Sequence, residues 1–244
     1  WMDTNHPAGT PRVGYPIEIQ ALWCSALEFL EEVEPGGGWA EIRDRAKSSI
    51  IEFFYDRDRR GYLSDCLHAS PGQSAAEAVA DDHLRPNQLF ALTLGAVDDK
   101  QIATGVLAAC EELLVPGGVR SLADREVSFE LPVWRDGVLL NDPAHPYHGR
   151  YEGDEDTRRK PGYHNGTVWN WPFPSYAEAL FLAYGDPAAE AAKSILASAV
   201  IPFNEGCLGH LPEIMDGDAP HQERGCGAQA WSVTELYRVL KILS

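Results

Sequence analysis

The helical spacing of apolar residues constrains this chain more than any other sequence feature. From Ile17 to Val33, apolar side chains recur at the period of an α-helix. The buried face of this helix is expected to hold Ile19, Leu22, Trp23, Ala26, Leu27 and Leu30. Pro35 and the glycines after it end the helix, and a second helix is expected from Trp39 to about Tyr55. A connection this short predicts an antiparallel helix pair.

The same spacing predicts about seven helices in all, arranged in pairs. The later ones are expected from Pro86 onward, over Lys100–Leu114, over Thr167–Tyr184, from Pro187 to about Ile201 after an Asp186 N-cap, and over Gln229–Leu243. Two long polar stretches, 56–84 and 119–166, show no helical pattern, and the alternation at 127–131 predicts a small hairpin in the second. Long loops in a compact domain are usually functional or disordered, and Tyr62 near Asp65 favours a functional loop.

Composition excludes several classes of partner. Lys and Arg total 20 against 37 Asp and Glu, a net charge of −17, which argues against nucleic acid and anionic membrane surfaces as partners. The five cysteines are widely spaced without a CxxC motif, so we expect a reducing, cytoplasmic location without a disulfide framework. No apolar run has the length of a membrane span. We expect no metal, because the pair His145 and His148 has no obvious third ligand.

The loops are rich in groups that suit a sugar. They supply carboxylates, amides, histidines and tryptophans, and a sugar ring offers apolar C–H faces together with a rim of hydroxyls. Glu213 stands out because Leu211, Pro212, Ile214 and Met215 surround it with apolar side chains, a setting that can tune a carboxylate for acid or base chemistry. The alternatives are a capping or hydrogen-bonded loop role for Glu213, and simple core packing for Trp169 and Trp171.

Several ordered motifs resemble one known family. They are Trp1-Met2-Asp3, Pro16 to Trp23, Arg85-Pro86-Asn87-Gln88, Gly149-Arg150-Tyr151-Glu152-Gly153, His164-Asn165-Gly166-Thr167-Val168-Trp169, Pro212-Glu213-Ile214 and Ala228-Gln229-Ala230-Trp231-Ser232. Together they resemble the glucosidase domain of glycogen debranching enzymes, the amylo-α-1,6-glucosidase region. The resemblance runs from the first residue to the last, and the order of the motifs makes it more specific than any one of them.

The resemblance implies an all-α fold, the (α/α)6 toroid of six helical hairpins, and an inverting glycoside hydrolase that releases glucose from α-1,6-linked branch stubs of glycogen or related α-glucans. It implies Asp3 as general acid and Glu213 as general base, with no cofactor. An inverting pair must leave room for a water, so its carboxyl groups are expected roughly 6.5–9.5 Å apart. The residues expected to hold the glucosyl unit lie in or beside the motifs: Glu18, Asp65, Arg85, Asn87, Gln88, His164, Trp169 and Trp231.

The chain departs from the family pattern at its start. The triplet that should lie in mid-domain stands at residues 1–3, and about seven helices are fewer than a complete toroid needs. We therefore expect residues 1–244 to be the C-terminal part of a single glucosidase domain whose first helices are absent from this chain. Asp3 then lies close to a terminus, where a solvated, frayed aspartate is the alternative interpretation.

Two other functions stay open at this point. Helical toroids with paired carboxylates also serve trehalases, other exo-α-glucosidases and disaccharide phosphorylases. From a different class, the chain could be a fragment that binds an α-glucan or oligosaccharide without cleaving it. The sequence predicts neither the linkage preference nor the oligomeric state.

Overall fold

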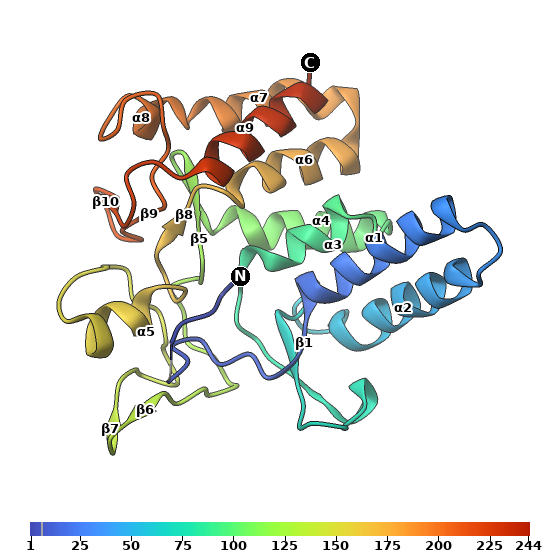
Figure 1. Ribbon diagram of the computed structural model, residues 1–244, viewed down its shortest axis with the longest axis horizontal. Coiled ribbons are helices and arrows are strands. Elements are labelled where there is room, and N and C mark those ends of the chain that lie inside the picture. The colour runs from blue at the N-terminus through green and yellow to red at the C-terminus, as the bar shows by residue number, and fades with distance from the viewer. Residues whose placement is uncertain (6) are drawn as a thin grey trace. The chain divides into compact units, whose positions relative to one another are not determined.

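A computed structural model describes residues 1–5 and 7–244 (Figure 1). The chain forms two compact units. The first comprises Trp1–Pro11, His83–Pro86 and Glu111–Ser244, and the second comprises Arg12–Asp82 and Asn87–Cys110. None of the helices in the described part of the chain combines the length and apolar character needed to cross a bilayer.

The second unit is built on the predicted helical hairpin. Helix α1 (Ile17–Val33) and helix α2 (Trp39–Phe54) pack side by side and run in opposite directions, which confirms the prediction (Figure 1). Gly38 precedes α2 with φ 81°, a backbone angle that favours glycine, so this residue allows the chain to reverse in a short turn.

The buried face of α1 differs from the prediction. Ile17, Ala21, Cys24 and Leu27 are buried, whereas Ile19, Leu22 and Trp23 are about half exposed. Helix α1 is apolar on more than one side, and periodicity alone therefore cannot select the side that packs against its neighbours.

Shorter elements before α1 and after α2 make up the rest of the second unit. An antiparallel sheet in the order β1-β2-β3 pairs Tyr15 with Leu67 and Leu67 with Ala80. The elements are β1 (Gly14–Pro16), β2 (Cys66–His68), the 3-10 turn η1 (Ala75–Glu77), β3 (Val79–Ala80), the 3-10 turn η2 (Pro86–Gln88), α3 (Leu89–Thr93) and α4 (Lys100–Glu111). The predicted helix at Pro86 is present, with proline in its first turn.

The first unit combines a small antiparallel sheet with a group of helices. The sheet has the order β10-β9-β8-β5-β4, and α6 packs against both α7 and α9 (Figure 1). Its strands are β4 (Leu114–Val115), β5 (Gly118–Arg120), β8 (Val168–Trp169), β9 (Ile214–Met215) and β10 (Glu223–Arg224), and a separate hairpin joins β6 (Trp134–Arg135) to β7 (Val138–Leu139). Its helices are η3 (Glu155–Arg159), α5 (Lys160–Gly162), α6 (Phe173–Tyr184), η4 (Asp186–Ala188), α7 (Ala189–Ala197), α8 (Val200–Phe203) and α9 (Ala230–Ile242).

The chain is thus helix-rich, but the all-α prediction is too simple. Leu114, predicted as the last residue of a helix, instead begins the hairpin β4–β5, because Gly117 (φ 75°) turns the chain. The hairpin predicted at 127–131 is absent there, and a hairpin is found instead at β6–β7. Its two-residue turn, Asp136-Gly137, has positive φ at both positions, as tight hairpins require.

Three helix predictions in the first unit also need correction. The prediction places no helix between Val119 and Gly166, yet residues 155–162 are helical. Asp154 caps them by accepting hydrogen bonds from the Asp156 and Thr157 N–H groups. The helix predicted from Thr167 begins at Phe173, because residues 168–169 are taken into the sheet. Asp186 does not cap the following helix, since Gly185 precedes the turn η4 and no side chain caps it.

Candidate active site

Glu213 directly precedes strand β9 of the hairpin β9–β10. The pairs Glu223 with Met215 and Arg224 with Ile214 form the hairpin, and Glu213 extends it because its N–H donates to the Cys226 carbonyl at 2.8 Å. Strand β9 also pairs with β8 through Trp169 and Ile214. The sheet therefore holds the Pro212-Glu213-Ile214 motif next to the motif that begins at His164.

Both oxygens of the Glu213 carboxylate accept hydrogen bonds. The Tyr163 hydroxyl donates to Oε1, and the Cys226 N–H donates to Oε2 at 2.9 Å. Glu213 is half-buried, and burial together with the adjacent Glu213 carboxylate raises the pKa of Tyr163 well above its usual range. Tyr163 therefore stays protonated near neutral pH and can remain a donor to Glu213.

Gly225 allows Glu213 to take this position. It lies directly before Cys226 with φ 68°, and a Cβ atom there would lie 2.6 Å from Glu213 Oε2. Glycine thus serves two needs here, the left-handed backbone and the close approach of a carboxylate.

The hairpin also positions Tyr151. Asp216 is buried and accepts the Tyr151 N–H at 2.8 Å while pairing with Arg224 at 2.9 Å. The Tyr151 ring packs against the Tyr163 ring with centroids 5.4 Å apart. The Asp216–Arg224 ion pair therefore fixes both strands of the hairpin and the segment that carries Tyr151.

Asp3 lines a cavity of about 320 Å3 together with Thr4, Asn5, Tyr151, Glu155, Lys160 and Tyr163, here called the Asp3 cavity. Asp3 is exposed. Tyr163 connects the two candidate carboxylates, because it lines this cavity and hydrogen-bonds Glu213, and the charge of Asp3 contributes to its raised pKa. A volume of this size lies at the lower end of small-molecule sites.

The segment that carries Asp3 is held in place. His164 Nε2 hydrogen-bonds the Asp3 carbonyl at 3.3 Å, and the Asn165 side chain donates to the Gly9 carbonyl at 2.9 Å. The Trp1 ring packs edge-on against the His164 ring at 5.2 Å. These contacts argue against the frayed, solvated interpretation of Asp3, although its side chain itself is open to solvent.

Arg85 holds the loop that contains His164 and Asn165. It is 2% exposed, and its guanidinium donates to the carbonyls of Ser121 and His164 and to the Asn165 side chain. A buried guanidinium that satisfies three acceptors acts as a support for the loop. The resemblance implies that Arg85 holds the glucosyl unit, whereas these contacts direct its guanidinium to the protein.

The predicted aromatic residues form one cluster. Trp169 is 2% exposed and stacks on His164 with ring centroids 5.0 Å apart, and Trp231 stacks on Trp171 at 4.8 Å. Trp169 therefore packs in the core, the alternative raised above, whereas Trp231 is 39% exposed and retains an open surface. The resemblance singles out Trp231 but not its stacking partner Trp171.

The remaining four predicted residues belong to the second unit. Glu18 and Asp65 are buried and both pair with Arg12, at 2.5 and 2.6 Å. The Asn87 side chain donates to Asp65 Oδ1 at 2.7 Å, and Gln88 Oε1 accepts the Leu63 N–H at 3.2 Å. The structure thus gathers Glu18, Asp65 and Asn87 into one polar network around Arg12, which no sequence motif indicates.

Sequence reasoning missed Tyr163, Tyr151 and Arg12. Tyr163 directly precedes the His164 motif, and Tyr151 lies within the Gly149 motif, so both are close to residues selected from the sequence. No local pattern identifies Arg12 as the partner of Asp65, because 53 residues separate them in the sequence.

Two comparisons place these features among known proteins. Residues 1–238 match the family model described as amylo-alpha-1,6-glucosidase. The chain also resembles two solved structures: the GH63 mannosylglycerate hydrolase from Thermus thermophilus (TM-score 0.53, 17% identity, 91% of this chain and 45% of that one) and the neutral trehalase from Saccharomyces cerevisiae (TM-score 0.51, 14% identity, 91% and 36%). At such identities the likeness shows the fold alone.

The chain spans less than half the length of either structure. A search of curated proteins gave no match. The family match covers nearly the whole chain, and it includes both the Asp3 segment and the Glu213 hairpin. The chain belongs to the amylo-α-1,6-glucosidase family.

Proposed function

We propose that this chain supplies the catalytic carboxylates of a glycoside hydrolase that releases glucose from α-1,6-linked branch stubs of glycogen or a related α-glucan. One observation carries the proposal: Tyr163 both lines the Asp3 cavity and hydrogen-bonds Glu213. Tyr163 thus connects Asp3, which lines the cavity, with Glu213, and acid–base cleavage of a glycosidic bond needs such a pair of carboxyl groups. The chain's membership of the amylo-α-1,6-glucosidase family supports the class of reaction.

In this proposal Asp3 is the general acid and Glu213 the general base. Protonated Asp3 donates its proton to the glycosidic oxygen as the bond to the anomeric carbon breaks. Ionised Glu213 removes a proton from a water that attacks the opposite face of the sugar, so the configuration inverts. The donors Tyr163 and Cys226 fix the orientation of the Glu213 carboxylate, and a carboxylate has further lone pairs with which to bind the water.

We also propose that residues 1–244 are the C-terminal part of one (α/α)6 glucosidase domain. The two solved structures of similar fold are each more than twice as long as the matched chain, which supports a larger domain. We also propose a cytoplasmic location, in keeping with five cysteines that form no disulfide bond in the described part of the chain.

The proposal is tested with Glu213→Gln and Asp3→Asn in the full-length protein. Glucose release from a branched limit dextrin should fall at least about 100-fold in each variant, because each change removes a proton-transfer group. Glu32→Gln is the matched control, an exposed glutamate in α1, and should keep full activity. Circular dichroism checks that each variant is folded, and near-normal turnover by folded Glu213→Gln would reject the assignment.

The alternative functions predict different substrates. Trehalase or another exo-α-glucosidase activity would cleave trehalose or linear maltooligosaccharides, and a phosphorylase would need inorganic phosphate. Affinity for glucan without cleavage of any of these substrates would favour a binding fragment. A panel of these substrates, with and without phosphate, separates the four cases.

A further inference from the structure

The five cysteines of the chain fall into two groups. Cys24, Cys66 and Cys110 are buried, whereas Cys207 and Cys226 are exposed. Burial raises the pKa of Cys24 and the pKa of Cys66, so neither thiol readily forms the thiolate that reacts with oxidants. The two exposed thiols are therefore the ones that are open to a dissolved oxidant.

The two exposed cysteines belong to segments of the first unit that touch. Cys207 lies in the loop after α8, and Cys226 lies after β10 (Figure 1). A Cβ atom added to Gly227 would lie 2.8 Å from the Cys207 sulfur, so this sulfur lies against the residue next to Cys226. The Cys226 thiol donates to the Ala228 carbonyl at 3.3 Å, so both thiols border Gly227.

The surroundings of the two cysteines allow them to approach each other. Consecutive Cα atoms are about 3.8 Å apart, so the Cys207 sulfur has to shift by about one residue step to reach Cys226. Residues 204–210 are all exposed, and no packed core resists such a shift. Gly206, with φ 46°, precedes Cys207, and Gly227 follows Cys226, which gives both backbones freedom to adjust.

Cys226 is also the residue that holds the proposed base. Its N–H donates to Glu213 Oε2 at 2.9 Å, and its carbonyl accepts the Glu213 N–H at 2.8 Å. A disulfide bond that draws Cys226 toward the loop after α8 therefore acts on both the backbone and the carboxylate of Glu213. The hydrogen bond from Tyr163 holds only the other oxygen, so it cannot keep the carboxylate in its orientation alone.

We propose that Cys207 and Cys226 form a thiol-oxidation site, and that the disulfide bond between them reversibly lowers glucose release by displacing the Glu213 carboxylate. The effect on glucose release rests on the proposed function, whereas the disulfide itself does not. Cytoplasmic disulfides, where they occur, are usually transient and serve catalysis or redox sensing. The site is therefore compatible with the proposed location.

A small disulfide such as glutathione disulfide is the class of oxidant that the site needs. The Cys207 thiolate attacks one sulfur of this molecule, whose S–S bond breaks, and one glutathione leaves. The Cys226 thiolate then attacks the Cys207 sulfur, the protein disulfide forms and the second glutathione leaves. The two protein thiols are thereby oxidised, glutathione disulfide is reduced to two thiols, and the two protons of the protein thiols end on them.

The test is a peptide map of the full-length protein after equilibration in glutathione buffers of increasing oxidised fraction. Free thiols are blocked with N-ethylmaleimide in denaturant. Trypsin cleaves after Arg224, which places Cys207 and Cys226 on separate peptides, 194–224 and 225–238. Mass spectrometry should find these two peptides linked in the oxidised samples and separate after treatment with dithiothreitol. The three buried cysteines should carry the blocking group throughout.

Glucose release from a branched limit dextrin is measured on the same samples. It should fall about tenfold on oxidation, the size expected when a hydrogen bond to a charged group is lost, and recover with dithiothreitol. Cys207→Ser should keep normal release in reducing and oxidising buffers, because it removes one thiol without removing a contact to Glu213. Cys24→Ala is the matched control, which also removes one thiol, and should respond to oxidation as the wild type does.

The outcomes separate this proposal from the catalytic one. Peptides that each carry glutathione without a linked pair would overturn the oxidation site, as would a linked pair confined to a disulfide-bonded dimer on a non-reducing gel. A linked pair that leaves glucose release unchanged would overturn the effect on Glu213. A reduced protein that releases no glucose would instead reject the proposed function, while the linked peptides would still establish the oxidation site.

Discussion

Tyr163 is the residue on which the proposed site depends most. It contacts the Glu213 carboxylate, lines the cavity that contains Asp3 and packs against Tyr151. Because its pKa is raised, it donates a hydrogen bond at every pH at which a glycosidase of this kind would work. Its part in the proposal is to position Glu213.

Removing only the Tyr163 hydroxyl tests this positioning role. Tyr163→Phe should lower kcat about ten- to hundredfold, the range expected when a hydrogen bond to a charged group is lost. KM should change little, because the proposed base acts on water. Tyr237→Phe changes an exposed tyrosine of α9 and should leave kcat unaltered. An unchanged kcat in Tyr163→Phe would remove Tyr163 from the mechanism.

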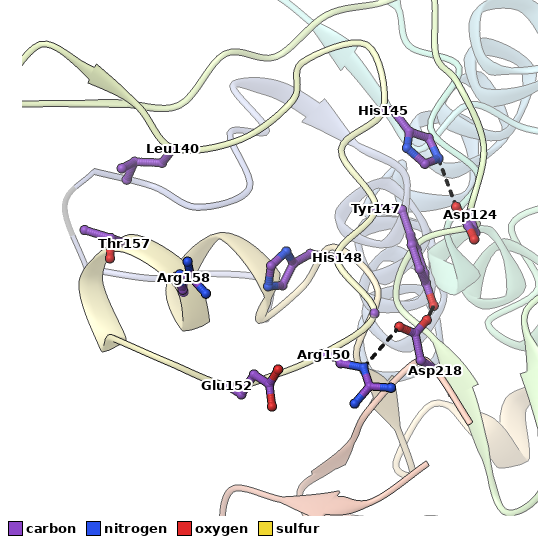
Figure 2. A pocket seen from close by; sticks show the side chains of 11 residues that line it. Asp124, Leu140, His145, Tyr147, His148, Arg150, Glu152, Thr157, Arg158 and Asp218 are labelled. Atoms are coloured by element: carbon purple, nitrogen blue, oxygen red, sulfur yellow. Dashed lines mark hydrogen bonds and ion pairs between the residues drawn. The ribbon is translucent and has the colours of Figure 1, made fainter. Parts of the chain in front are cut away.

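His148 gives a pH-dependent prediction at the same scale. Burial and the charge of Arg158 lower the pKa of His148 in the folded protein (Figure 2). In the unfolded chain the same imidazole takes up its proton at a higher pH, about 6.5. The neutral imidazole therefore contributes stability above about pH 6.5 that is lost as the pH falls below it. NMR titration, with the signal assigned through His148→Gln, should give a midpoint below about 6.5. A midpoint at or above that value would contradict the buried setting.

At the scale of elements, helices are easier to predict than strands. The predicted bounds of α1 are the same as the observed ones, because a helix of 17 residues repeats its apolar spacing over several turns. Strands β8, β9 and β10 have two residues each, too few for alternation, and distant residues form their pairs. The sheet that carries Glu213 therefore could not be read from local pattern, although the motif containing Glu213 could.

Gly225→Ala tests whether the hairpin places the Glu213 carboxylate. The new methyl group would lie 2.6 Å from Oε2 at a residue with φ 68°, so the carboxylate must move. We expect glucose release to fall about tenfold or more, with a loss of about 1 kcal/mol in unfolding free energy for the strained backbone. Gly36→Ala is the control: it has a similar φ of 85° but open space around the added methyl group, so it should lose stability without loss of activity. Equal activities in the two variants would contradict the argument.

Arg12, which precedes β1, joins Glu18 of α1 to Asp65, the residue before β2, in the second unit. It pairs with Glu18 and Asp65, and the exposed fractions of the three side chains are 8%, 6% and 1%. Arg12→Ala would leave two buried carboxylates without their cation, which should cost about 3–5 kcal/mol in unfolding free energy. Arg43→Ala breaks the surface pair with Asp44 and should cost under about 1 kcal/mol. Chemical denaturation measures both, and similar losses would show that the Arg12 network is not a buried one.

For the whole molecule, the ordered motifs are enough to predict the family, and the match over residues 1–238 confirms it. The substrate-binding residues are harder to predict than the family, because a sequence motif gives the residue types but not the atoms that each side chain contacts. Arg85 and Trp169 are examples, since both are buried and their polar groups contact the protein. The cavity lined by Tyr147, His148 and Arg158 could not be predicted, because loops and the helix at 155–162 assemble its wall from distant parts of the sequence (Figure 2).

The configuration of the first product tests the account most directly at this scale. If Asp3 and Glu213 act as acid and base on a single water, the α-linked substrate must give β-glucose first. Proton NMR of full-length protein with a branched limit dextrin would detect the anomeric signal before mutarotation. The account predicts initial β-glucose, lost in Glu213→Gln; initial α-glucose would show retention through a covalent intermediate and would contradict the proposed roles of both carboxylates.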